Sequence, residues 1–183
     1  MLRDRRIGGR VLVPEDGPPV GSYGVLAVDG ANSMGIRPGP DGAFEVPAVE
    51  TSQRVVLRFP VTGPELGSLA LSTAGEESEE VVLDFRNLVQ VVRFQLLDES
   101  QRPGAGERLL VAPLGEGLPG PLRGEFYAVS ADEEGWLNLA FSLSYEQVRL
   151  ARSVPPGGDW ARAMEGAEVL TLARLLDSLV IPH

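Results

Sequence analysis

The 183-residue chain has no cysteine, and its single histidine is the last residue, His183. Without cysteine the protein forms no disulfide, no thiolate metal site and no cysteine nucleophile. A Ser-His-Asp triad or a histidine zinc ligand would need His183 to be held by a rigid shell, which a chain terminus rarely provides. We therefore expect no catalytic residues, no cofactor and no enzyme activity.

Lysine is also absent, so all 16 basic residues are arginines, and 26 acidic residues give a net charge of −10. Apart from Arg3, Arg5 and Arg6, the arginines are scattered along the chain. An acidic chain without a basic stripe is not expected to bind nucleic acid or an anionic membrane surface. No run approaches the ~18 apolar residues of a spanning helix, so we expect no membrane insertion.

The N-terminal segment MLRDRRIGGR carries positive charge but no apolar region behind it, unlike a secretory signal peptide. If Met1 is the native start, we expect a cytoplasmic protein. If the chain is excised from a longer one, a secreted or cell-surface location is the alternative.

Aromatic residues make up only 6% of the chain, whereas 43% of its residues are hydrophobic and it also has 22 glycines and 15 prolines. This composition is typical of a globular, turn-rich protein. Short segments with the composition of strands, such as Gly24–Val28 and Arg54–Phe59, lie between turns such as Asp16-Gly17-Pro18-Pro19. Their length and spacing predict an all-β sandwich rather than βαβ units.

The pattern of residues 7–47 recurs in residues 91–139 as strand, Pro/Gly turn, strand, and acidic-Gly turn followed by an aromatic residue. The clearest matches are Pro19 with Pro103, Gly42 with Gly135, Phe44 with Trp136, and Glu80–Leu83 with Glu168–Thr171. We therefore predict two tandem Ig-like or transthyretin-like β-sandwich domains, 1–88 and 89–183, that arose by duplication.

Residues 159–180 have two interpretations. Asp159 could cap a helix, since apolar residues at 161, 164, 172, 175, 176 and 179 fit one helical face. The duplication instead places a strand near 168–173, which we favour, followed by a short helical or apolar tail.

The first copy resembles the carboxypeptidase regulatory-like domain, a seven-stranded transthyretin-like β-sandwich. The resemblance rests on Gly9-Arg10-Val11, the turn Asp16-Gly17-Pro18-Pro19-Val20, and Asp41-Gly42-Ala43-Phe44. The second copy keeps Pro103 and Gly135-Trp136 but lacks the Gly-x-Val start and the Asp-Gly turns. The resemblance implies a non-catalytic accessory or adhesion module and supplies no catalytic residues.

Carboxylates offer a weak calcium candidate at Asp132, Glu133 and Glu134, because the following glycine can fold a loop inward. A solvated turn is the favoured interpretation there, and Trp136 is expected to belong to the core. We predict no other metal site.

Binding residues are expected near the end of the chain. Trp160 follows two glycines in a predicted loop, and the tail is too apolar to stay free, so it should dock on this chain or on a neighbour. The predicted contact residues are Trp160, Leu175, Leu176, Leu179 and Val180. We expect a structural or protein–protein interaction module that contacts another chain or itself. The alternative is an accessory module that binds carbohydrate or a cell-surface polymer.

Overall fold

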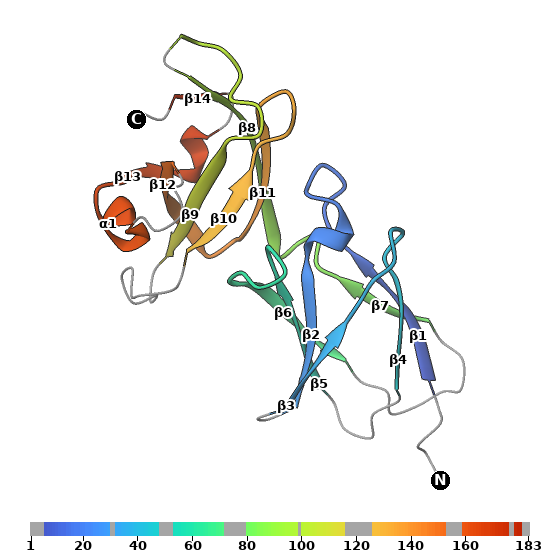
Figure 1. The fold of residues 1–183 in the computed structure, drawn as a ribbon. Coiled ribbons are helices and arrows are strands. Elements are labelled where there is room, and N and C mark those ends of the chain that lie inside the picture. The colour runs from blue at the N-terminus through green and yellow to red at the C-terminus, as the bar shows by residue number, and fades with distance from the viewer. Residues whose placement is uncertain are drawn as a thin grey trace. The chain divides into compact units, whose positions relative to one another are not determined.

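The computed structural model describes residues 6–29, 32–47, 53–71, 80–98, 100–115, 126–152, 159–175 and 178–180. The chain divides into two compact units, unit 1 over Met1–Gln90 and unit 2 over Val91–His183. In Figure 1, unit 1 runs from blue to green and unit 2 from green to red. The boundary expected from the sequence, between residues 88 and 89, falls where the strand Val89–Leu97 begins.

Unit 1 is built from short strands joined by glycine- and proline-containing turns, with one 3-10 turn. Its described elements are β1 (Arg6–Leu12), η1 (Val20–Ser22), β2 (Gly24–Asp29), β3 (Asn32–Ile36), β4 (Ala43–Pro47), β5 (Gln53–Arg58), β6 (Glu65–Leu71) and β7 (Val81–Asp84). They form a three-stranded sheet, β4-β1-β7, and a four-stranded sheet, β3-β2-β5-β6. Strand β1 pairs antiparallel with β4 and parallel with β7, whereas the four-stranded sheet is antiparallel throughout.

Apolar side chains of both sheets form the core of unit 1. Val55 and Leu57 of the four-stranded sheet are 0% exposed, and Val11 and Leu83 of the three-stranded sheet are 2% exposed. Each such side chain contributes about 1.5–3 kcal/mol by burial. The burial of these side chains between the sheets is therefore what holds the two layers together.

Unit 2 repeats this plan strand for strand. Its described elements are β8 (Val89–Leu97), β9 (Arg108–Gly115), β10 (Tyr127–Ser130), β11 (Trp136–Ser142), β12 (Tyr145–Arg152), α1 (Trp160–Glu165), β13 (Glu168–Thr171), η2 (Leu172–Arg174) and β14 (Ser178–Val180). The sheets are β11-β8-β14 and β10-β9-β12-β13, and β8 pairs parallel with β14 as β1 does with β7. The prediction of an all-β chain with two tandem β-sandwiches is confirmed.

The turn before β4 and the turn before β11 have the same hydrogen bonds in the two units. The Val11 amide donates to the Gly42 carbonyl oxygen at 2.9 Å, and the Leu96 amide donates to that of Gly135 at 2.8 Å. Both glycines have positive φ, 84° and 79°, which residues with a side chain rarely adopt. A Cβ on Gly42 would lie 2.3 Å from the Val11 carbonyl oxygen, so this turn requires glycine.

Two of the sequence matches between the copies are wrong, and the first concerns Trp136. The Gly39 amide donates to the Ala43 carbonyl oxygen, and the Asp132 amide donates in the same way to Trp136. Trp136 therefore corresponds to exposed Ala43, not to Phe44. Since neighbouring strand residues face opposite sides, this one-residue difference moves Trp136 out of the core, where Leu137 is 2% exposed.

The second wrong match pairs Glu80–Leu83 with Glu168–Thr171. Strand β7 lies beside β1 at the edge of a three-stranded sheet, whereas β13 lies beside β12 at the edge of a four-stranded sheet. The counterpart of β7 is β14. The match fails because the link before the sixth strand is longer in unit 2. Residues 59–64 join β5 to β6, whereas residues 153–167, which include α1, join β12 to β13.

Helix α1 is the element that unit 2 adds to the shared plan. The Asp159 side chain accepts a hydrogen bond from the Arg162 amide at 3.1 Å, which satisfies a free N–H of the first turn. Asp159 thus caps a helix, as one of the two interpretations allowed, but the helix ends at Glu165 and does not continue to residue 179. The favoured strand near 168–173 is confirmed as β13. In the described part of the chain no helix is long and apolar enough to cross a membrane.

Candidate binding surfaces

The shifted titratable groups among the described residues are explained by local structure. Hydrogen bonds from Arg86 lower the pKa of Asp84, and the Arg102 backbone amide lowers the pKa of Asp98. Burial raises the pKa of Tyr23 and of Tyr127. None of these shifts pairs an acid with a base for proton transfer. His183 lies outside the described residues.

The acidic turn at Asp132 has a structural task. Its Oδ1 accepts hydrogen bonds from the Glu134 amide at 2.9 Å and from the Trp136 amide at 2.8 Å. Glu133 and Glu134 are exposed. Within the ranges that the structure covers, no three histidine or acidic residues gather in a metal-binding group. The calcium candidate stays a prediction, and one oxygen of Asp132 is engaged in closing the turn.

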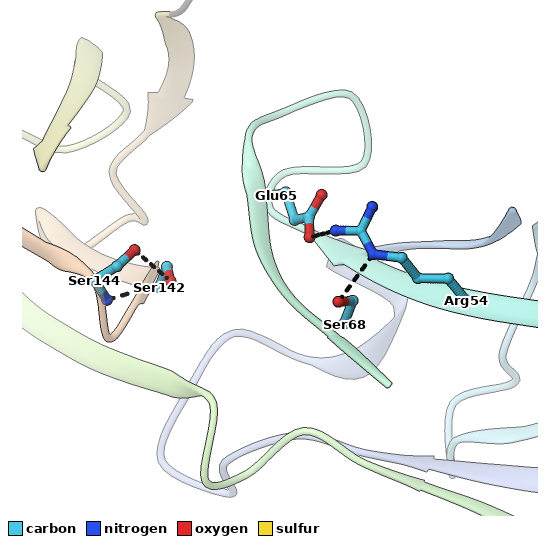
Figure 2. Close-up of polar contacts among 5 residues, drawn as sticks. All are labelled: Arg54, Glu65, Ser68, Ser142 and Ser144. Carbon is cyan, nitrogen blue, oxygen red and sulfur yellow. Dashed lines mark hydrogen bonds and ion pairs between the residues drawn. The ribbon is translucent and has the colours of Figure 1, made fainter. Parts of the chain in front are cut away.

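Arg54 forms a network on the outer face of the four-stranded sheet of unit 1. Its guanidinium crosses from β5 to β6, donating through Nε to Ser68 Oγ at 3.0 Å and pairing through Nη2 with Glu65 (Figure 2). This network has no signal in the sequence, because the partners of Arg54 lie 11 and 14 residues away. Only the β5–β6 register brings them together.

The outer faces of the two four-stranded sheets carry the same pattern of pairs. In unit 1, Leu26 faces Val56 and Val28 faces Arg54. The pairs in unit 2 are an apolar pair, Leu110 with Ala151, and an alanine–arginine pair, Ala112 with Arg149. On each outer face, therefore, a cross-strand pair of apolar residues lies next to a pair that contains an arginine.

In unit 2 this face is covered by α1. Met164, 3% exposed, packs in one cluster with Leu110, Ala112 and Ala151. Arg149 Nη1 donates to the Met164 carbonyl oxygen at 3.5 Å, near the C-terminal end of the helix where a cation is favourable. In unit 1 no α-helix is present among the described residues, and Val56 is nevertheless 2% exposed. The four-stranded faces therefore offer little apolar surface.

The outer face of the sheet β11-β8-β14 is different. Trp136 is half-buried there, and the Arg93 guanidinium lies over its ring, 4.6 Å from the centroid. Gln95 Nε2 of β8 donates to the carbonyl oxygen of Glu134, in the turn before β11, at 2.8 Å. An aromatic ring beside a guanidinium can contact a ligand that has both apolar and hydroxyl groups.

Exposed valines lie on an edge strand of each unit. Val82 of β7 is 56% exposed and Val169 of β13 is 41% exposed. Among the described residues each of these strands pairs with one neighbour only, so the backbone N–H and C=O groups along its other side have no ladder partner there. An extended segment of another chain can pair with such an edge.

A tight turn joins β11 to β12 in unit 2. The Ser142 and Ser144 hydroxyl groups lie 2.9 Å apart, and the Ser144 amide donates to Ser142 Oγ at 3.3 Å (Figure 2). Leu143 at the turn is 59% exposed. Isolated exposed leucines are common on protein surfaces, so Leu143 alone defines no site.

The predicted contact residues lie in several different places. Leu175 is 1% exposed, so it packs within the protein. Leu179 and Val180 belong to β14 and lie opposite Leu96 and Leu97 of β8. Trp160 begins α1, its side chain is outside the described part of the chain, and so is all of Leu176. Their role in binding stays a prediction.

Sequence comparison finds no matching family model and no matching curated protein. Among solved structures, the chain is similar to GBS52, the minor pilin of Streptococcus agalactiae, at TM-score 0.40 and 10% identity over 97% of this chain and 94% of that one. It is similar to a carbohydrate-binding module of family CBM26 from Eubacterium rectale at TM-score 0.32 and 12% identity, over 96% and 91% of the two chains.

A streptococcal ancillary pilin is similar at TM-score 0.33 and 12% identity over 97% of this chain. The chain spans 62% of that pilin, less than two thirds of its length. At these low identities and TM-scores the similarities supply no function. The function is argued from the residues of the chain itself.

Proposed function

We propose that the protein is a non-enzymatic interaction module that joins other protein chains, including further copies of itself, through strand edges. The observation that carries the proposal is the exposed valine on an edge strand of each sandwich, Val82 in β7 and Val169 in β13. A β-branched apolar side chain suits a paired strand, whereas solvent-exposed edges are commonly protected by charge or proline.

The chemistry of the described residues supports a binding role over catalysis. The shifted carboxylates, Asp84 and Asp98, are each held by neighbours within a few residues, Arg86 and Arg102. Such groups stabilise turns and are not poised for proton transfer. We further propose that unit 1 is a carboxypeptidase regulatory-like domain, which the Asp41 side chain supports by accepting from the Ala43 amide at 3.1 Å beside Gly42.

The test is the mass of the full chain in solution over a range of concentrations, by sedimentation. We expect concentration-dependent association that Val82→Lys or Val169→Lys weakens by about tenfold or more, because a lysine on an edge strand opposes pairing. Val61→Lys is the matched control, since Val61 is 54% exposed but lies in the turn between β5 and β6.

Two outcomes would contradict strand-edge joining. One is a wild-type chain that stays monomeric in sedimentation and that, when chemically cross-linked to other proteins, captures the same partners as both lysine variants do. The other is association that Val61→Lys weakens as much as Val82→Lys does.

A second candidate is an accessory module that binds carbohydrate or a cell-surface polymer. Trp136 favours it, because this large ring lies half-buried on an outer sheet face with Arg93 over it instead of in the core. A monomer that binds polysaccharide would support this candidate over strand-edge joining.

A further inference from the structure

Trp136 occupies a position where the fold does not need a large side chain. The matching hydrogen bonds of the two turns place Trp136 at the position of Ala43 in unit 1. Ala43 is exposed, and the unit 1 sandwich closes around Phe44 and Val46 without a ring at that position. Core packing therefore does not explain the tryptophan of unit 2.

A cationic group lies over the Trp136 ring. The Arg93 guanidinium lies 4.6 Å from its centroid, and no carboxylate within the described ranges forms an ion pair with Arg93. Gln95, two residues along β8 from Arg93, donates to the carbonyl oxygen of Glu134 in the turn that leads to Trp136. Arg93 thus fixes one side of the ring and keeps N–H donors that a ligand can use.

The charge around the ring favours a neutral ligand. The turn next to Trp136 carries three carboxylates, on Asp132, Glu133 and Glu134, and the whole chain has a net charge of −10. A polyanion would be repelled by this surface. A neutral ligand with many hydroxyl groups and an apolar C–H face would not meet this electrostatic repulsion.

We propose that the outer face of the β11-β8-β14 sheet binds a neutral saccharide, with Trp136 as the ring platform and Arg93 as a hydrogen-bond donor to hydroxyl groups. The proposal rests on the second candidate function and adds to it the neutral charge of the saccharide and the role of Arg93. The sugar's C–H face packs on the indole while its hydroxyl groups meet the guanidinium.

The experiment uses NMR of the full chain, which has two tryptophans and hence two indole N–H signals. The probes are neutral hexasaccharides of glucose, xylose and N-acetylglucosamine, with polygalacturonate as the anionic comparison. We expect at least one neutral probe to shift the Trp136 indole signal in a saturable way. Trp136→Ala should weaken binding by about tenfold or more, equivalent to 1.4 kcal/mol.

The variants are chosen so that loss of folding does not imitate loss of binding. Trp136→Ala restores the residue type that unit 1 carries at Ala43, so it should fold, and its amide spectrum checks this. Arg93→Gln should weaken binding less than Trp136→Ala, because it keeps an N–H donor. Trp160→Phe should leave binding unchanged.

The proposal is overturned if no neutral probe shifts the Trp136 signal, if polygalacturonate binds in preference, or if Trp160→Phe removes binding. These outcomes are distinct from failure of the strand-edge proposal. Saccharide binding at Trp136 can be absent while Val82→Lys still weakens association. Conversely, a chain that stays monomeric can still bind a saccharide.

Discussion

Arg152 of β12 reaches back to Glu107, and its Nη1 donates to Glu107 Oε2 at 2.8 Å across 45 residues of sequence. The two side chains are 16% and 32% exposed, so this ion pair is the least exposed of those described. It ties β12 to the turn that leads into β9. Ion pairs shielded from water gain more from their partners than surface pairs do.

We therefore expect Glu107→Gln to lower the free energy of unfolding by about 1–2 kcal/mol, since Arg152 loses its counter-charge. Urea unfolding measures the change. Glu65→Gln is the control, because the Arg54–Glu65 pair is 54% and 37% exposed and such pairs contribute about 0–1 kcal/mol. Equal losses in both variants would contradict the difference in burial.

Gly42→Ala should destabilise the protein more than Gly135→Ala. Both residues have positive φ, which costs an alanine about 1–2 kcal/mol. Gly42 adds a contact of 2.3 Å between the new Cβ and the Val11 carbonyl oxygen, against contacts of 3.0–3.1 Å at Gly135. Thermal unfolding provides the measurement, and Gly8→Ala, with nothing within 4 Å of its Cβ, should be close to neutral. The reverse order would mean that the Gly42 turn moves easily.

Asp159→Ala should lower the stability of α1 by about 1 kcal/mol, because the Arg162 amide loses its hydrogen-bond acceptor. Hydrogen exchange at the amides of residues 162–166 reports this loss locally. Met164→Ala should cost more, about 2–4 kcal/mol, because Met164 is 3% exposed over Leu110 and Ala151. Unchanged exchange in both variants would show that α1 does not pack as described.

Stability should fall in acid partly because of Asp84 and Asp98, whose pKa values are lowered by hydrogen bonds from Arg86 and from the Arg102 amide. A carboxyl with a lowered folded pKa stabilises the fold above its unfolded pKa, about 3.9. That contribution disappears as the pH falls through the lower folded value. Asp84→Asn and Asp98→Asn should each make the free energy of unfolding depend less on pH between about pH 2 and 5. A wild-type slope in both variants would contradict this.

Much of the fold follows from local features of the sequence. Asp41-Gly42 and Asp132 with Gly135 predict tight turns because glycine reaches positive φ and aspartate accepts nearby amides. Asp159 predicts the start of α1 for the same kind of reason. These interactions span a few residues, so no knowledge of the tertiary fold is needed to find them.

Register and pairing could not be found in this way. Trp136 and Leu137 are neighbours, and a difference of one residue decides which of them enters the core. Glu168–Thr171 matches β7 in the sequence comparison, yet it pairs with β12 as β6 pairs with β5, because the longer link that contains α1 moves the sixth strand of unit 2 further along the sequence. The Arg54 network depends on residues 11 and 14 positions away.

The sequence alone determined the all-β class, the duplicated plan, the turn glycines and the absence of cysteine chemistry, because these depend on residue type and short spacing. Only the tertiary structure decided which side chains face outward. It placed Arg93 over Trp136, exposed Val82 and Val169 on strand edges, and covered Leu110 with Met164. Such choices arise from pairing between distant strands, whose register is set by the collective burial of both sheets.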